Sequence, residues 1–592
     1  MPDFLGGSVI MRACSRLGKR IGKTAQVSLL FGRRKKRDYG SHSKLVAAMN
    51  RVHPAEAVVT AMGQSGLFGW LYRYWGRLAS SSVSALLWLL TPFLGLLTAS
   101  MAVAGRWMAA GALLLALGAA FLIFFGGGSL ADWLGSSLAG RWIGKYCRFP
   151  AAEQSRSLRW YLGVCGLIGG GIGWVLGVKL AVVAAVGLAG FPILFAIPTH
   201  WMVCLLCLTL PLTGTSICWA LSFVIVVLYF FGRAFRGERG KKVDTVDLLL
   251  LIFPLLCVVS TVFSFAVVDS AKVSAMWLGL FACVFFIRRA VNTKRRLMAV
   301  LGALTVGAVL SGVVGLYQYL SGAVDTTWTD TSMFEELELR VYSTFANPNV
   351  YGEFLLLMIP LTAALAMYAN GKKRWLLVGV NALLLVNLVL TYSRGCYVGI
   401  LITALIYLWN FSKKWLSALL VLGVPLALLL MPASVVERIM SIGNMADRST
   451  SYRMMIYIGT LLMLAHHWLG GVGIGELAYN AIYPYYALTG IIAPHSHSLF
   501  FQSVVSFGIV GLIWLLLMWW VYQRRTKRTQ LRMERRDRLL MIGFNAVFWG
   551  MMLQSAFDYT WYNYRVFQLF WIVFVLGIAA AEVLTPKKEE KR

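Results

Sequence analysis

Long runs of apolar residues, separated by short polar segments, follow one another along most of this chain. Because about 20 apolar residues in an α-helix cover the hydrocarbon core of a bilayer, each run predicts a membrane-spanning helix. In the C-terminal part we expect ten spans, at 246–268, 272–288, 297–320, 350–370, 375–392, 395–411, 415–433, 500–521, 539–557 and 566–583. In the N-terminal part we expect spans at 83–105, 107–126, 159–178 and 180–198, and a tight pair at 201–213 and 216–231. The total is sixteen, or fourteen if one hairpin does not cross.

Composition supports the same class. Hydrophobic residues make up 59% of the chain and the mean hydropathy is +0.71, which is more apolar surface than a soluble domain buries. We therefore expect an all-α fold, a polytopic transmembrane helical bundle of about 14–16 spans. The nine cysteines lie mostly within the apolar runs, which argues against a disulfide framework.

We attribute the net charge of +31 to the membrane topology and not to a nucleic-acid partner. From residue 233 onward the Lys and Arg residues gather in alternate loops, as they do in loops that stay in the cytoplasm. These basic loops lie at 233–242, 288–296, 372–374, 413–414 and 524–538. We therefore expect both termini in the cytoplasm and the intervening loops on the opposite side of the membrane. The outer loops are 321–349, the turn at 392–394, the long loop 434–499 and the turn 558–565.

Four regions follow from this reading. Residues 1–82 form a basic cytoplasmic segment, and 83–231 form a transmembrane extension. Residues 232–583, which include the extracytoplasmic loop 434–499, form the main transmembrane domain, where the candidate site residues described below lie, and 584–592 form a cytoplasmic tail.

Arginine and histidine residues gather in the outer segments. Arg340, Arg394 and Arg453 carry guanidinium groups, which hold phosphate oxygens through paired, charge-assisted hydrogen bonds. His495 and His497 end the long loop, and histidine can take a proton from an attacking hydroxyl near neutral pH. Together these residue types indicate a diphosphate leaving group and a hydroxyl nucleophile.

Each of these residues also has a structural interpretation. Arg394 at a span end is typical of a side chain that anchors a helix at the interface. Arg340 could pair with the acids of 335–338, and Asn347-Pro-Asn349 is a frequent helix-start sequence. The glycines of Gly470–Gly475 are expected to permit tight turns beside His466 and His467. The four histidines raise a metal hypothesis, but no carboxylate stands at a metalloprotease-like spacing, so we expect no metal.

Four motifs occur in a fixed order along the chain. They are Arg340-x-x-Ser-Thr-Phe-Ala-Asn-Pro-Asn349, Thr391-Tyr-Ser-Arg-Gly395, Gly471-Val-Gly-Ile-Gly475 and His497-Ser-x9-Gly-Ile-Val-Gly511. In this order and membrane context the chain resembles the O-antigen ligase and polymerase superfamily of bacterial envelope proteins. The resemblance covers roughly residues 200–583. It departs from many relatives at His466-His-Trp-Leu-Gly470, where they have a proline, and in the long N-terminal part.

The resemblance implies a membrane glycosyltransferase that moves a glycan en bloc from undecaprenyl diphosphate to an acceptor hydroxyl, without metal, cofactor or nucleotide sugar. It assigns His497 as the base, and Arg394 and Arg453 to the diphosphate. Arg340, Asn347 and His495 are further substrate-site candidates. The implied partners are the lipid-linked donor, a glycan or glycolipid acceptor and membrane lipids.

Two alternatives stay open. A polymerase of lipid-linked repeat units shares the same motifs. A transporter or flippase of lipid-linked glycans fits less well, because the spans hold few ionisable residues, with Glu353 the main candidate, and no internal repeat is evident.

Overall fold

The computed structural model describes residues 54–124, 129–130, 156–237, 243–323, 340–430, 433–440 and 448–586. The chain divides into two compact units, and the larger one, Pro54–Lys241 with Leu249–Arg592, holds nearly all of the described helices. The structure is 84% helical, and the described residues form no β-strand. This confirms the all-α fold.

Thirteen helices in the described part are long and apolar enough to cross a membrane, so this is a multi-pass membrane protein. In the N-terminal region they are Val83–Val103 (with α5, Leu87–Val103), Trp107–Phe124 (α6) and Val178–Ala196 (with α10, Val178–Gly190). In the C-terminal region they are α12 (Thr215–Phe235), α13 (Thr245–Val262), α14 (Val267–Ala290), α15 (Lys294–Ser321), α16 (Pro348–Tyr368), α17 (Gly371–Leu390), α18 (Arg394–Phe411), α24 (Leu499–Gln530), α25 (Arg535–Phe557) and α26 (Tyr564–Val583).

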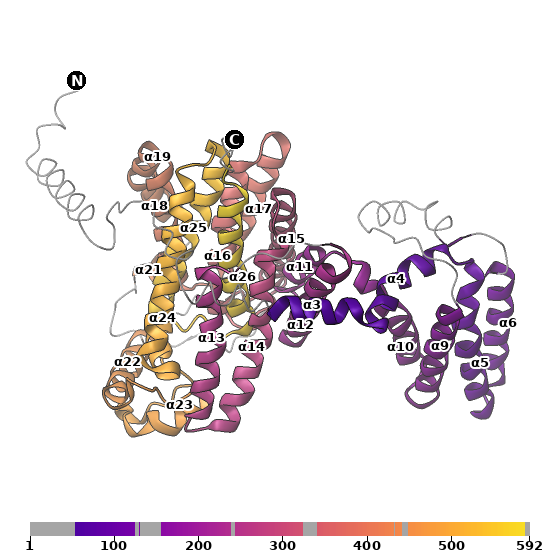
Figure 1. The fold of residues 1–592 in the computed structure, drawn as a ribbon. Helices are drawn as coiled ribbons and strands as arrows, with labels where there is room; N and C mark the ends of the chain where they lie inside the picture. The colour runs from indigo at the N-terminus through magenta and orange to yellow at the C-terminus, as the bar shows by residue number, and fades with distance from the viewer. Residues whose placement is uncertain are drawn as a thin grey trace, which may run out of the picture. The chain divides into compact units, whose positions relative to one another are not determined.

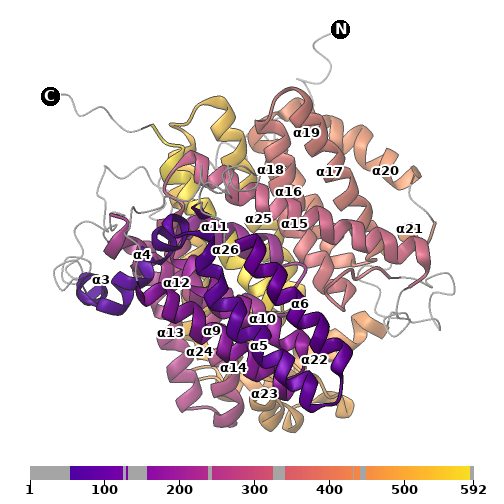
Figure 2. The same ribbon diagram turned by 90° about the vertical axis from the view of Figure 1, so that its right-hand side faces the viewer.

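The centre of the C-terminal bundle is formed by α16, α25 and α26, which Figures 1 and 2 show packed side by side. Buried residues make up 83%, 78% and 89% of their apolar stretches, against 17% for α17 and for α18. Helices such as α17 and α18, whose apolar residues are mostly not buried within the protein, need a lipid environment. The three central helices therefore form the core to which the polar segments described below are attached.

Three of the sixteen expected spans do not meet the length and hydropathy required. The segment at 159–178 forms α9 (Arg156–Leu176), whose glycines and arginines lower its hydropathy. The segment at 201–213 forms α11 (Thr199–Thr209), which is too short. The segment at 415–433 is divided into α19 (Lys413–Ala418), a π-turn and α20 (Val424–Leu430). Apolar composition predicted a helix in each case, but not its length or continuity.

Glycine explains why α9 packs closely in spite of its low hydropathy. A Cβ atom at Gly166 would lie 2.2 Å from the Leu89 carbonyl oxygen of α5. One at Gly169 would lie 2.5 Å from the Ala185 side chain of α10. The absence of side chains at these positions lets three helices approach one another. Two further helices, α3 (Pro54–Gln64) and α4 (Gly66–Ser80), precede them in the chain.

The segment expected as one long outer loop, 434–499, is largely helical. It contains α21 (Ala433–Met440), α22 (Arg448–His467) and α23 (Glu476–Ile482). After it comes α24, which is two helices joined at Gly508, where φ is +67° and ψ is −173°. The first of these is the nine-residue piece 499–507, so the x9 spacing of the histidine motif is the length of this short helix.

The glycine motif meets the α24 kink. Gly471, Gly473 and Gly475 all have positive φ values, a conformation that favours glycine. A Cβ atom at Gly471 would lie 2.4 Å from the Val505 carbonyl oxygen, and one at Gly508 would lie 1.9 Å from that of Leu469. These glycines therefore act structurally: they let loop 468–475 lie directly against the kink.

Candidate functional site

His497 lies in a tight turn immediately before the short first helix of α24. Its φ is +49°, a left-handed conformation that costs free energy in any residue other than glycine. Side chains hold the turn: His495 Nδ1 accepts a hydrogen bond from the His497 amide at 3.1 Å, and Gln502 Oε1 accepts one from the Ser496 amide at 2.9 Å. Tyr457 of α22 donates to the His497 carbonyl oxygen at 3.1 Å. These three hydrogen bonds hold the strained backbone of the turn in place.

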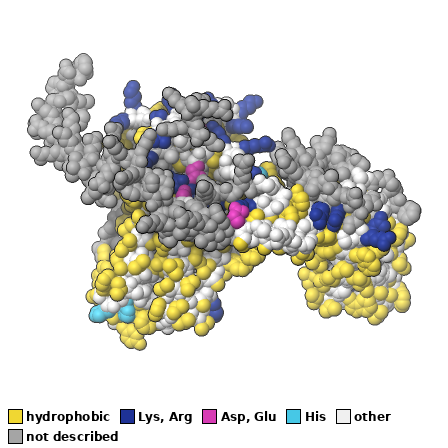
Figure 3. Space-filling model, viewed as in Figure 1, with side chains coloured by type: hydrophobic (Ala, Val, Ile, Leu, Met, Phe, Trp, Pro, Cys, Tyr) yellow, Lys and Arg dark blue, Asp and Glu magenta, His cyan; other side chains and the backbone are white. Residues whose placement is uncertain are grey.

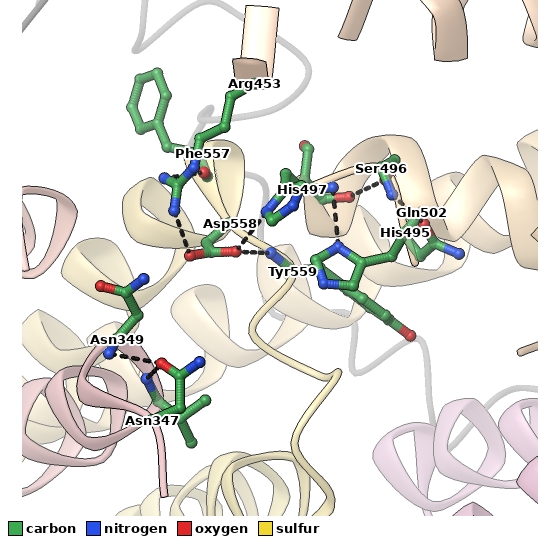
Figure 4. A network of polar contacts seen from close by, with 12 residues as sticks. Asn347, Asn349, Arg453, His495, Ser496, His497, Gln502, Phe557, Asp558 and Tyr559 are labelled. Atoms are coloured by element: carbon green, nitrogen blue, oxygen red, sulfur yellow. Dashed lines mark hydrogen bonds and ion pairs between the residues drawn. The ribbon is translucent and has the colours of Figure 1, made fainter. Parts of the chain in front are cut away.

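Asp558 is the residue on which the site converges (Figure 4). It follows the last residue of α25, and its main-chain carbonyl accepts a hydrogen bond from the Leu499 amide at 3.2 Å, which joins the start of α24 to the end of α25. One carboxylate oxygen, Oδ1, lies 3.4 Å from His497 Nδ1 and accepts the Tyr559 amide at 2.9 Å. The other, Oδ2, lies 3.2 Å from Arg453 Nη2.

Arg453 approaches the site from α22. Besides its ion pair with Asp558, its Nη1 donates to the Phe557 carbonyl oxygen at 3.1 Å. Tyr457, one helical turn further along α22, also donates to that carbonyl oxygen at 3.1 Å. Residues from three helices that are far apart in the sequence therefore meet here, and we call Arg453, Tyr457, His495, His497 and Asp558 the His497 cluster.

The pKa values of Asp558 and His495 are both lowered in this cluster. Burial alone would raise the pKa of Asp558, but the positive charge of Arg453 and the hydrogen bond from His497 outweigh it, and the pKa falls below its usual value. Burial, reinforced by His497, lowers the pKa of His495 to about 3. Near neutral pH Asp558 is therefore an anion and His495 is neutral.

The charge of Asp558 determines what His497 can do. An ionised carboxylate only accepts hydrogen bonds, so it favours the histidine tautomer with a proton on Nδ1. The other ring nitrogen, Nε2, then carries a lone pair that can accept a proton. The His497 side chain is 19% exposed, so a substrate can reach it. An imidazole that a carboxylate orients in this way has the chemistry of a general base.

A second group of polar residues lies around Arg340, which is 9% exposed. Its Nε donates to the Thr391 carbonyl oxygen and its Nη2 to Asn349 Oδ1, both at 3.0 Å. Asn347 caps α16, because its side-chain oxygen accepts the amides of Asn349 and Val350 at 2.8 and 3.3 Å. We call Arg340, Asn347, Asn349 and Thr391 the Arg340 cluster.

The geometry of this cluster supports the structural interpretation of Asn347-Pro-Asn349 as a helix start. The acids proposed as alternative partners for Arg340, at 335–338, lie outside the described residues. Arg340 itself ties the segment before α16 to the turn before α18. Its role is therefore visible in the fold, whereas a contact with substrate stays a prediction.

Arg394 is the first residue of α18, at the same end of the bundle as Asp558. Its neighbour Gly395 lies against Gln554 of α25, because a Cβ atom there would be 2.1 Å from the Gln554 side-chain oxygen. Gln554 precedes Asp558 by one helical turn. The structure thus places the start of α18 beside the end of α25, while diphosphate binding by Arg394 stays a prediction.

Residues with a left-handed backbone also gather in the motifs. Four described residues other than glycine have positive φ: Ser343, Ala346, Tyr392 and His497, at +49° to +58°. Each lies within one of the motifs that begin at Arg340, Thr391 and His497. Such conformations persist only where surrounding contacts enforce them, and they concentrate at functional sites.

Sequence reasoning missed Asp558 and Tyr457. The turn 558–565 was placed outside the membrane, but its first residue, an acid at the end of a span, was given no role. Glu353, considered only as evidence for a transporter, is buried in α16 at 3% exposure. The available signal for Asp558 was its position: a carboxylate that ends an outward-directed span is placed to meet arginines on the same side.

The comparisons with known proteins agree with the motifs. Residues 379–516 match the family model described as O-antigen ligase. The match runs from α17 into α24 and includes Arg394, Arg453, His495 and His497, but neither Arg340 nor Asp558. No curated protein matches the chain. Within the described residues, no group of three or more His, Cys, Asp or Glu side chains could hold a metal ion.

Proposed function

We propose that this chain is a ligase. The proposal starts from the match of residues 379–516 to the O-antigen ligase family, which supports a membrane enzyme of the ligase or polymerase type. It transfers a glycan en bloc from undecaprenyl diphosphate to an acceptor hydroxyl, at the extracytoplasmic face of a bacterial inner membrane. Both chain termini lie in the cytoplasm. The observation that supports this proposal most strongly is the contact between His497 Nδ1 and the ionised Asp558.

In the proposed reaction the acceptor hydroxyl attacks the anomeric carbon of the first sugar. His497 Nε2 takes the hydroxyl proton while the new carbon–oxygen bond forms. The bond between that carbon and the diphosphate oxygen breaks, and its electron pair leaves with undecaprenyl diphosphate. Asp558 stabilises the imidazolium that results, as a carboxylate behind a catalytic histidine does.

Positive charge is needed where the diphosphate leaves, because its charge grows as the bond breaks. Arg453 is already at the site, held by Asp558 and the Phe557 carbonyl oxygen. Arg394 begins the neighbouring helix, α18. We assign both to the diphosphate, with Arg453 also fixing the orientation of Asp558.

His495 acts as a positioning residue in this proposal. Its Nδ1 is occupied by the His497 amide, and its ring lies 4.7 Å from that of Tyr562 and 5.3 Å from that of Tyr559. Because it is 6% exposed, it has little surface to offer a substrate. It works through the backbone of His497, which it holds in the left-handed conformation.

The direct test is glycan transfer by purified protein in detergent, from a lipid-linked donor to an acceptor. His497→Ala should lower the rate by at least about 10²-fold, the usual contribution of a general base. The matched control is His466→Ala, because His466 is an exposed histidine of the same segment that bonds only to its own helix. Transfer by His497→Ala at the level of this control would refute the assignment. Transfer in detergent would also exclude a transporter, which needs two compartments.

A polymerase that joins lipid-linked repeat units remains the second candidate, because the matching family model does not separate the two activities. A strain lacking this protein distinguishes them. Accumulation of long lipid-linked chains without an acceptor indicates a ligase, whereas loss of long chains indicates a polymerase.

A further inference from the structure

Helix α22 divides its side chains between two faces. The inward face carries the polar residues Arg453, Tyr457 and Thr460, the last of which hydrogen bonds to the Tyr479 hydroxyl at 2.8 Å. From Met454 to Ala465 the outward face is apolar. Its exposed positions there recur with the period of a helix and are Met454, Ile458, Leu461, Leu462 and Ala465, while Tyr452 and His466 are exposed before and after them.

This arrangement is the reverse of the one found in a helix on a water-exposed surface. A surface helix in water turns its apolar stripe to the core and its polar side chains outward. Here Met454, Ile458, Leu461 and Leu462 are 41% to 50% exposed, while the arginine faces inward. Among the described residues from 450 to 492, the exposed side chains that can carry a charge are Glu476 and His466, and His466 lies in the last turn of α22.

The apolar surface continues from α22 onto a membrane span. Trp468 and Leu469, which follow α22, are also exposed. The Trp468 carbonyl oxygen accepts the Ile509 amide at 2.8 Å, so this loop lies against the second part of α24. On α24 the exposed positions Val510 and Ile513 come next. The exposed apolar positions of the span therefore follow directly on Trp468 and Leu469 at the end of α22.

The hairpin between α13 and α14 extends the same surface. The Phe265 amide donates to the Val472 carbonyl oxygen at 3.1 Å, and the Phe265 ring lies 5.6 Å from that of His467. At this tip Phe263 and Val268 are 77% and 71% exposed. Figure 3 shows hydrophobic side chains covering this part of the protein around α13, α14, α22 and α23.

We infer that α22 and loop 468–475 lie within the membrane, with the outward face of α22 against the hydrocarbon chains of the bilayer. The apolar outward stripe, the inward arginine and the continuity with α24 point to lipid as the occupant of this surface. The segment expected from its charge to be a loop in the aqueous phase is thereby assigned to the bilayer. One consequence is that only the width of α22 separates the Arg453 side chain from lipid.

Site-specific fluorescence in vesicles tests this assignment. Leu462 or Ile458 is replaced by a single cysteine, and the purified variant is labelled in detergent with an environment-sensitive maleimide dye. The labelled protein is then reconstituted into vesicles of ordinary or brominated phospholipids. Glu476→Cys is the matched control on the same segment, because Glu476 is exposed but charged. The unsubstituted protein measures labelling of the native cysteines; the seven that the structure describes are buried.

Dyes at 458 and 462 should emit at short wavelength and lose most of their intensity in brominated lipid, whereas the dye at 476 should keep its intensity. A dye at 458 or 462 that brominated lipid does not quench overturns the inference. Long-wavelength emission would then mean that water covers the face, and short-wavelength emission that another protein segment does. The outcome does not depend on transferase activity, so it can fail while the proposed function stands.

Discussion

The His497 cluster and the Arg340 cluster lie at the same end of the bundle and use similar residue types, yet they differ in what their arginines contact. Arg453 meets a carboxylate that also binds a partly exposed histidine. Arg340 is buried and donates to the Thr391 carbonyl oxygen and to Asn349 Oδ1, which ties the segment before α16 to the turn before α18. A charged, titratable and accessible arrangement can move protons, whereas a buried arginine that bridges two segments holds them together. We therefore assign proton transfer to the His497 cluster and structural support to the Arg340 cluster.

The largest effect should come from removing the charge of Asp558. Asp558→Asn keeps the size of the side chain, but an amide no longer selects the tautomer of His497 that leaves Nε2 free. We expect kcat to fall about 10²–10⁴-fold, measured as glycan transfer by protein of unchanged elution volume. Asp269→Asn is the control, a carboxylate near α23 that contacts the Leu477 amide. Equal activity of the two variants would remove Asp558 from the mechanism.

Exchanging arginine for lysine in each cluster should separate the two roles. Arg453→Lys keeps a charge beside Asp558 but loses the fork, and we expect kcat to fall about tenfold, which corresponds to about 1.4 kcal/mol, with little change in Tm. Arg340→Lys leaves a buried acceptor unpaired at a cost of about 1–3 kcal/mol, so Tm should fall while the folded protein keeps its kcat. Melting curves and transfer rates of both variants check this. The opposite pattern would reverse the comparison.

His495 should tolerate only replacements that accept a hydrogen bond at the same place. The side-chain oxygen of Asn can stand close to the position of Nδ1, whereas that of Gln is one methylene group further out. We expect His495→Asn to stay within about threefold of wild type, and His495→Ala and His495→Gln to lose about tenfold in kcat with KM unchanged. Loss of activity in His495→Asn equal to that in His495→Ala would indicate a chemical role instead.

The pH profile gives an independent check on His495. Its pKa is about 3 in the folded protein, below the ordinary 6.5, so its contribution to stability is complete above pH 6.5 and is lost as the pH falls toward 3. The lowered pKa of Asp558 acts in the same direction at still lower pH. Between about pH 5 and 8 the rate profiles of wild type and His495→Asn should therefore superimpose. An inflection that disappears in the variant would contradict the positioning role.

The smallest effect should come from the helix cap at Asn347. Asn347→Ala removes the acceptor for two amides, which costs about 1 kcal/mol and lowers Tm by a few degrees. Asn347→Asp keeps the acceptor and should keep Tm. Neither change should alter transfer by the folded protein. A loss of transfer with an unchanged Tm would make Asn347 a substrate-binding residue after all.

Much of the fold could be predicted because a span is a local property of about 20 residues. The apolar run that gives α26 needs no information from elsewhere in the chain. The π-turn between α19 and α20 and the length of α11 depend on packing, which composition does not report. The helix α22 was missed for a related reason: its inward polar residues lower its hydropathy, and only the fold shows that its outward face is apolar.

The site was predictable in part. His497 and Arg453 stood out because charged and titratable residues are rare in such a chain. Asp558 did not, since it is 61 residues from His497 and 105 from Arg453, and only the packing of α22, α24 and α25 brings them together. The bonds of Arg340 to Thr391 and Asn349 are likewise tertiary, and the sequence did not indicate them.

The central claim is that His497 and Asp558 act as one unit, and a double-mutant cycle on purified protein tests it most directly. The measurement compares kcat/KM for glycan transfer in wild type, His497→Ala, Asp558→Asn and the double variant. If the two residues act together, Asp558→Asn costs about 10²–10⁴-fold when His497 is present and nothing further when it is absent. Losses that multiply in the double variant would show that the two residues act independently, and would contradict the account.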